Sequence, residues 1–318
     1  MNLVSDARAG QLVTPYAAGS LLAAIPLTAA TLGWWRRTVL LSIGGLLAFN
    51  TVTAVSSSYA LTLVARFFAG VSAGLAWGII AGHARRMVPG HLQGRALALA
   101  MTGTPLALSL SLPDVPGQAS DRRVSVKVVF LTPGIRPVLF VICAWMLAHN
   151  VLYTYVAPFV TRAGLGGRVD LVLLVFGVSA LFGIWLVGRL VDRWLRVTVI
   201  ASLLAFALVA VALLAGDTIP AVVYLAVALW GLAFGGAATL LGTAGADAAG
   251  EGVDTAQAMN TTAWNLAIAG GGVGLLLDCF GAGSFPLAVL LLLLPALAVA
   301  RSARTDGFRP GPRAASLR

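Results

Sequence analysis

Long apolar runs separated by short polar segments dominate this chain. The runs fall at about 10–32, 38–57, 60–82, 95–112, 135–159, 170–190, 197–215, 219–241, 257–277 and 283–300. Most of them reach the roughly 20 residues that an α-helix needs to cross a bilayer. The connecting segments are short, as they are in helical bundles. The pattern therefore predicts an all-α fold, a polytopic bundle of membrane helices.

The composition favours a membrane protein over a nucleic-acid-binding one. Hydrophobic residues make up 59% of the 318 residues and charged residues only 10%, whereas soluble domains carry about 25% charged residues. A net charge of +10 would indicate nucleic acid in a soluble protein. Here, however, the basic residues lie between the apolar runs. We therefore expect a lipid bilayer, and no nucleic acid, as the partner.

A charged motif follows the sixth of these runs, within LFGIWLVGRLVDRWLR at residues 181–196. Gly188, Asp192, Arg193 and Arg196 form the pattern G-x3-D-R-x2-R. The motif resembles that of the major facilitator superfamily, in the short loop between the second and third helix of each half. The resemblance implies a gating latch on the cytoplasmic face, with Asp192 capping or pairing across to neighbouring helices. A plain charged stop after a membrane span is the alternative interpretation.

The resemblance covers about nine of the twelve helices of that family. It implies an incomplete N-terminal helical half at 1–112, without the first helix and most of the fifth and sixth. A cytoplasmic linker at 113–134, a complete six-helix C-terminal half at 135–301 and a basic cytoplasmic tail at 302–318 follow. The branch that the chain resembles, the arabinose-efflux-like and drug-efflux permeases, expels sugars or drugs in exchange for protons.

The distribution of basic residues supports this topology independently. With loops assigned as the family implies, seventeen of the 21 basic residues fall on the inside, in agreement with the positive-inside rule. We expect a multi-pass protein of the inner (plasma) membrane with a cytoplasmic C-terminus. Segment 95–112 does not fit, because Arg95 and the basic linker would hold both of its ends inside. Either it fails to span, or half of the molecule opposes its charge bias.

Polar residues inside the apolar runs are the candidates for contact with a solute. These substrate-binding candidates are Arg66, His149, Asn150, Tyr153, Trp230, Asn260 and Asn265. Each has a structural alternative: Asn265 bridging helices, Trp230 packing, Tyr153 at an interface, and Arg66 snorkelling to water. No Asp or Glu lies in the middle of an apolar run, so His149 is the mid-membrane group that could titrate near neutral pH.

The sequence thus predicts a transporter that rocks two halves about a central site, with proton-coupled efflux of a small organic solute. No metal cluster, nucleophile–base pair or phosphate loop is recognisable, so we expect no enzyme, cofactor or metal site. The alternative is a non-transporting truncated protein that packs with other membrane helices. We expect no coupled flux from the chain alone, and self-association that covers the incomplete half and Arg66 is one expected arrangement.

Overall fold

The computed structural model describes residues 13–31, 35–86, 124–271 and 275–311, and in these ranges every regular element is a helix. The N-terminal helices are α2 (Val13–Thr31), α3 (Trp35–Val55) and α4 (Tyr59–Arg86). They match three predicted apolar runs, and α2 and α3 both pack on α4. The predicted segment 95–112 and most of the linker lie outside the described residues.

The C-terminal helices follow the predicted runs from residue 135 onward. They are α7 (Val126–Leu131), α8 (Ile135–Thr154), α9 (Val156–Thr161), α10 (Val169–Gly216), α11 (Pro220–Gly235), α12 (Ala237–Ala249), α13 (Val253–Gly271), α14 (Leu275–Phe280) and α15 (Phe285–Ser302). Short 3-10 turns lie at Gly166–Arg168, Gly250–Gly252 and Ala282–Ser284. Six stretches of the described residues are long and apolar enough to cross a membrane.

Helix α10 holds two of the predicted spans, joined at one residue. Trp194 alone has non-helical backbone angles, φ −130° and ψ 31°. Phe176, before it, and Phe206, after it, both contact the ring of Trp230. In a straight helix these two residues would be about 45 Å apart. The chain therefore reverses at Trp194, and we call residues 169–193 the first limb of α10 and 195–216 the second limb.

Glycines let neighbouring helices approach until backbone meets backbone. A Cβ added at Gly183 or Gly235 would collide with backbone atoms of Leu232 and Ala180 respectively, so α11 packs directly on the first limb of α10. In the N-terminal helices a Cβ at Gly70 would collide with the backbone of Tyr16 on α2. Small residues at such crossings are typical of membrane helix pairs, where close packing replaces the hydrophobic effect.

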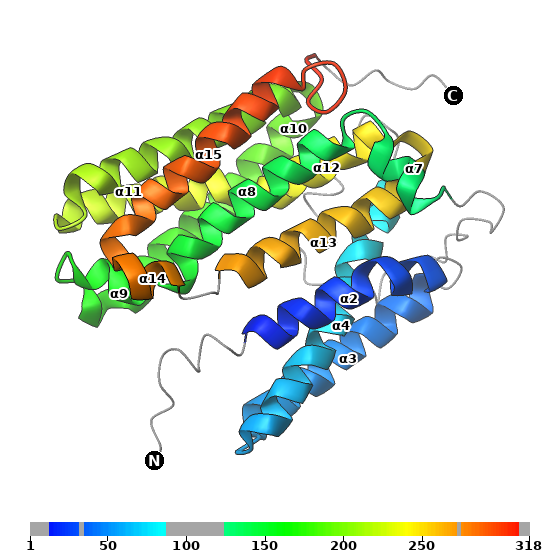
Figure 1. Cartoon of the computed structure of the whole chain (residues 1–318), viewed down its shortest axis with the longest axis horizontal. Coiled ribbons are helices and arrows are strands. Elements are labelled where there is room, and N and C mark those ends of the chain that lie inside the picture. Colours follow the sequence, from blue (N-terminus) through cyan, green and yellow to red (C-terminus); the bar gives the residue numbers. More distant parts are fainter. Residues whose placement is uncertain (1–12, 32–34, 87–123, 272–274, 312–318) are drawn as a thin grey trace.

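Helix α13 joins the N-terminal and C-terminal helices. It packs on α8 on one side and on α2 and α4 on the other, and in Figure 1 it lies between α8 and the blue N-terminal helices. The large core of the C-terminal half surrounds side chains that are almost fully buried, among them Trp145, Phe206 and Phe285. The C-terminal half is thus one packed bundle, with α13 at its boundary.

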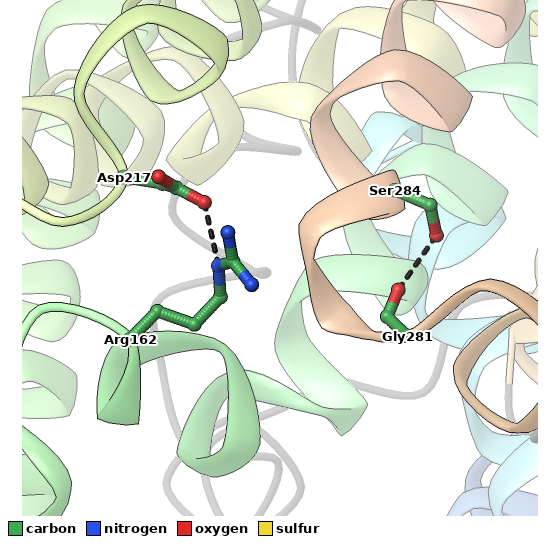
Figure 2. Close-up of polar contacts among 4 residues, drawn as sticks. All are labelled: Arg162, Asp217, Gly281 and Ser284. Atoms are coloured by element: carbon green, nitrogen blue, oxygen red, sulfur yellow. Dashed lines mark hydrogen bonds and ion pairs between the residues drawn. The ribbon is translucent and has the colours of Figure 1, made fainter.

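Charged and polar contacts tie three loops together at one end of the bundle. Arg162, at the end of α9, donates from Nε to Oδ2 of Asp217, just after α10, at 2.6 Å (Figure 2). The Arg162 guanidinium also lies against Gly283 in the turn before α15. In that turn the Ser284 hydroxyl donates to the carbonyl of Gly281, which has φ 70°. The pair is partly exposed, so we expect it to add under about 1 kcal/mol.

Candidate functional site

An aromatic cluster fills the space between α8, α10 and α11. The imidazole of His149 stacks on the ring of Phe234, with centroids 3.5 Å apart and planes 2° from parallel. The Trp230 ring lies 5.3 Å from His149 and 4.6 Å from Phe176. The ring of Tyr153 stacks beside His149 at 5.1 Å. With Phe206, which packs on Trp230, these six residues form what we call the aromatic cluster.

Helical spacing explains why these rings converge. His149 and Tyr153 are four residues apart on α8, and Trp230 and Phe234 are four residues apart on α11, so each pair shares one helix face. Phe176 and Phe206 come from the two limbs of α10, and the reversal at Trp194 brings them together. Such ring pairs add about 0.5–1.5 kcal/mol each beyond the burial of their area. The cluster therefore combines closely packed rings with two unpaired polar atoms.

Two nitrogens in the aromatic cluster are buried without a hydrogen-bond partner among the described residues. They are Nδ1 of His149 and Nε1 of Trp230, on side chains that are 7% and 2% exposed. A buried polar group without a partner costs about 1–3 kcal/mol, and native proteins leave few of them unexplained. Each nitrogen thus has an unused hydrogen-bonding position in this structure.

The other predicted solute contacts lie apart from the aromatic cluster. Asn150 faces α13, where Gly271 packs on its Cβ, and its amide donates to the Met146 carbonyl at 2.7 Å. Asn260 lies against Gly245 of α12. The amide of Asn265 donates to the Thr261 carbonyl within α13. These three side chains serve helix packing or their own helix in this structure.

Arg66 lies in the N-terminal helices, on α4. Its guanidinium carbon is 4.8 Å from the centroid of the Tyr16 ring on α2, a cation–π contact. The side chain is half-buried. The structure therefore brings His149, Tyr153 and Trp230 together out of the seven predicted residues, and it places Arg66 in the packing of α2 on α4.

In the charged motif, Arg196 has the clearest contacts. Its guanidinium donates to the carbonyls of Ala300, Phe308 and Arg301 at 3.0, 3.1 and 2.8 Å. It thereby satisfies backbone acceptors at the end of α15, which a helix otherwise leaves unpaired. Gly188 and Asp192 are half-buried, and Arg193 is exposed.

The segment after α15 folds back against the bundle beside Arg196. Phe308 is fully buried in the C-terminal core, and its amide donates to the Ala303 carbonyl at 2.8 Å. Gly134, with φ 93°, lies against the backbone of Asp306 and Gly307, where a Cβ would collide. Arg196 therefore joins the α10 reversal, the end of α15 and the segment that follows it.

Sequence reasoning missed Phe176, Phe206 and Phe234. Each lies in an apolar run with no polar neighbour to mark it, so the sequence presents each as an ordinary core residue. The one usable signal was the spacing of four residues between Trp230 and Phe234, which matches that between His149 and Tyr153. The contact of rings from α8 with rings from α11 is a tertiary arrangement, and spacing within one helix does not report it.

Comparison with known proteins decides the family. The model of the Major Facilitator Superfamily matches residues 112–272, which is half of the chain. The chain belongs to this superfamily. A probable sugar efflux transporter of Mannheimia succiniciproducens is 25% identical over 82% of this chain and 75% of its own length. A chloramphenicol efflux pump of Mycobacterium tuberculosis is 26% identical over 84% of this chain and 76% of its own length.

A solved facilitator structure has the same fold. The proton:xylose symporter XylE, bound to 6-bromo-6-deoxy-D-glucose, superposes with a TM-score of 0.76 at 13% identity, over 95% of this chain and 87% of that chain. The prediction of an all-α, major-facilitator-like membrane bundle is thereby confirmed. The chain is a multi-pass transporter of the plasma membrane and not an enzyme. It lies in a lipid bilayer and acts on a small-molecule substrate.

Proposed function

We propose that this facilitator carries the solute site of an exporter for small organic molecules, a sugar or a drug, and that the aromatic cluster forms part of that site. The main support is the pair of buried, unpartnered nitrogens on His149 and Trp230, set among flat rings. Pyranose rings and aromatic drugs both present one apolar face and several hydrogen-bonding groups. The relatives named as sugar and chloramphenicol efflux proteins support the same two solute classes.

We propose that protons drive this export, with His149 as the group that exchanges them. Its Nδ1 is buried at membrane depth, and the rings that surround it are those of Tyr153, Phe176, Trp230 and Phe234. A histidine changes charge more readily near neutral pH than any other side chain. A solute that hydrogen-bonds this nitrogen would compete with a proton for it, which is the requirement for exchange.

We propose further that coupled flux from the chain alone is impaired. Residues 87–134 hold one apolar run, 95–112, where the family places the end of one half and the linker to the next. Two bilayer crossings need about 40 residues of apolar sequence. Alternating access depends on two halves that close about the site, so a shortened half would bind solute without moving it efficiently.

One experiment on the purified full-length chain separates these proposals. Binding of radiolabelled chloramphenicol and glucose is measured by equilibrium dialysis, and uptake is measured in proteoliposomes with an acidic interior, with and without a protonophore. We expect saturable binding of one probe and uptake no greater than in empty vesicles. Insertion of the fifth and sixth helices of the M. tuberculosis relative between Arg86 and Arg136 is expected to restore protonophore-sensitive uptake.

Each proposal has an outcome that overturns it. Failure to bind either probe would overturn the solute site and favour a non-transporting protein that packs with other membrane helices. Strong gradient-driven uptake by the unmodified chain would overturn the impairment. Restored uptake that the protonophore does not reduce would overturn proton coupling.

We propose that the end of the bundle with the arginines, which we call the basic end, faces the cytoplasm. The positions of the arginines in the sequence place five of them at this end, as the positive-inside rule expects: Arg189, Arg193, Arg196, Arg301 and Arg304. In a chain with Cys143 and Cys279 replaced by serine, a membrane-impermeant maleimide should label Gly167→Cys in intact cells. The same reagent should label Arg304→Cys only after permeabilisation, and the reverse pattern would overturn this orientation.

A further inference from the structure

The aromatic cluster has few groups that can form hydrogen bonds with a solute. Its three phenylalanines, Phe176, Phe206 and Phe234, have no polar side-chain atom, and no member is Asp, Glu, Lys or Arg. Its unpaired buried atoms are Nδ1 of His149 and Nε1 of Trp230. The indole Nε1 is a donor only, so its partner has to be a hydrogen-bond acceptor. The cluster therefore combines a large aromatic surface with two hydrogen-bonding positions.

The predicted asparagines do not add hydrogen-bonding positions to the cluster. Asn150 follows His149 directly on α8, but it faces α13 and its amide donates to the Met146 carbonyl at 2.7 Å. The amide of Asn265 donates to the Thr261 carbonyl within α13, also at 2.7 Å. A solute among the rings would therefore form its hydrogen bonds with the two nitrogens of the cluster.

This shortage of polar groups distinguishes a sugar from a flat aromatic solute. A hexose has a hydroxyl group on almost every carbon, and each one that is buried without a partner lowers affinity about fivefold or more. A flat aromatic ring has no such groups to pair, and each ring that it contacts raises affinity by about 2- to 12-fold. The composition of the cluster therefore favours an aromatic solute that also has an acceptor for Trp230.

Tyr153 is the exposed member of the cluster. Its side chain is 44% exposed, whereas the other five members are buried or half-buried. It lies one residue before the end of α8, and at Tyr155 the backbone leaves the helical conformation, with φ −114° and ψ 31°. Exposed side chains exchange rotamers within nanoseconds. The Tyr153 ring can therefore turn outward while the buried rings stay in place.

The Tyr153 ring occupies a position in which a flat solute would meet the whole site. Its centroid is 5.1 Å from that of His149, with the two planes 23° apart. It lies 5.6 Å from the Phe176 ring and 6.3 Å from the Trp230 ring. An aromatic ring in the same position would stack on the imidazole and lie beside the indole that carries the unpaired Nε1.

We propose that the solute of this site is a flat aromatic molecule with a hydrogen-bond acceptor, and that it takes the position of the Tyr153 ring on His149. The acceptor pairs with Nε1 of Trp230, and Tyr153 turns outward when the solute binds. This inference rests on the proposed solute site. It adds the chemical class of the solute and the side chain that the solute displaces.

Equilibrium dialysis of the purified full-length chain tests both parts. We expect the wild-type chain to bind radiolabelled chloramphenicol, which has a nitrophenyl ring, about 100-fold more tightly than glucose. Benzamide and cyclohexanecarboxamide present the same acceptor, but only benzamide is flat. Benzamide should therefore displace chloramphenicol at a concentration about tenfold lower.

Substitutions of Tyr153 test the displacement. Tyr153→Ala should bind chloramphenicol about 2- to 12-fold more tightly than the wild type, because no ring contact has to be broken first. Tyr153→Phe keeps the ring and should bind as the wild type does. Tyr59→Ala is the matched control, because Tyr59 is 41% exposed and lies at the start of α4, away from the cluster. Its affinity for chloramphenicol should be unchanged.

The outcomes separate this inference from the proposed site on which it rests. If the wild-type chain bound neither probe, the solute site itself would be wrong. If glucose bound as tightly as chloramphenicol, or cyclohexanecarboxamide competed as well as benzamide, the site would stand and the aromatic class would be wrong. Unchanged or weaker binding of chloramphenicol by Tyr153→Ala would overturn the displacement. Thermal melting confirms that each variant is folded, and the two carboxamides test the wild-type chain if a variant unfolds.

Discussion

The variant His149→Phe is expected to remain folded and to lose solute binding by about tenfold or more. Phenylalanine keeps a flat ring that stacks on Phe234, and it removes a buried nitrogen that has no partner in the structure. Removal of an unpaired polar group in favour of an apolar one is close to neutral or stabilising. A solute that pairs with this nitrogen would instead lose about 1–3 kcal/mol, and each 1.4 kcal/mol is tenfold in affinity.

Equilibrium dialysis with chloramphenicol and glucose, together with thermal melting, measures the two effects on the same sample. Trp145→Phe is the control, because Trp145 is also on α8, fully buried and without a partner for its Nε1, but it lies outside the aromatic cluster. Its solute affinity should be unchanged. If His149→Phe bound solute as well as the wild type did, His149 would be a packing residue and the proposed site would be wrong.

Gly235→Ala is expected to destabilise the C-terminal half by about 1–3 kcal/mol. The added methyl group would meet the backbone of Ala180, which has no freedom to rotate aside as a side chain would. The two helices would have to separate, and the contacts of α11 with the first limb of α10 would weaken together. Because α11 also carries Trp230 and Phe234, we expect solute binding to fall as well. Thermal melting in detergent and equilibrium dialysis measure the two effects.

Gly177→Ala makes the same chemical change on α10 and serves as the control. Nothing in the described structure lies within 4 Å of a Cβ at Gly177, so its melting temperature should equal that of the wild type or rise slightly, as alanine favours a helix. If both variants melted alike, backbone contact at Gly235 would not determine the packing of α11 on α10.

The apolar runs identified most of the helices, because the bilayer thickness sets the length of a spanning helix and this length appears in the sequence as the length of an apolar run. The runs 170–190 and 197–215 were predicted as separate spans, and the structure joins them through Trp194 in one helix with two limbs. A reversal through one residue leaves no loop for the sequence to show. The run 219–241 was predicted as one span. In the structure it is divided at Gly236 into α11 and α12, and α12 extends beyond the predicted end to Ala249.

The site was less accessible to sequence reasoning, for a physical reason. A polar residue within an apolar run is visible, but the direction in which it points depends on which helices surround it. His149 and Asn150 are adjacent in sequence, yet His149 faces α11 and Asn150 faces α13. The motif was clear as a pattern, but its clearest contacts join Arg196 to carbonyls more than 100 residues away. Whether Asp192 acts as a latch stays a prediction.

Those distant carbonyls set the order in which the molecule can be assembled. The acceptors of Arg196 lie 104, 105 and 112 residues further along the chain. At about 5–20 residues per second, roughly 5–20 s of synthesis separate the arginine from its acceptors. During that interval water or lipid headgroups accept the hydrogen bonds of the guanidinium. The turn around Trp194 does not yet have its contact with the end of α15. The basic end of the C-terminal half is therefore completed last, when α15 and Phe308 have emerged from the ribosome.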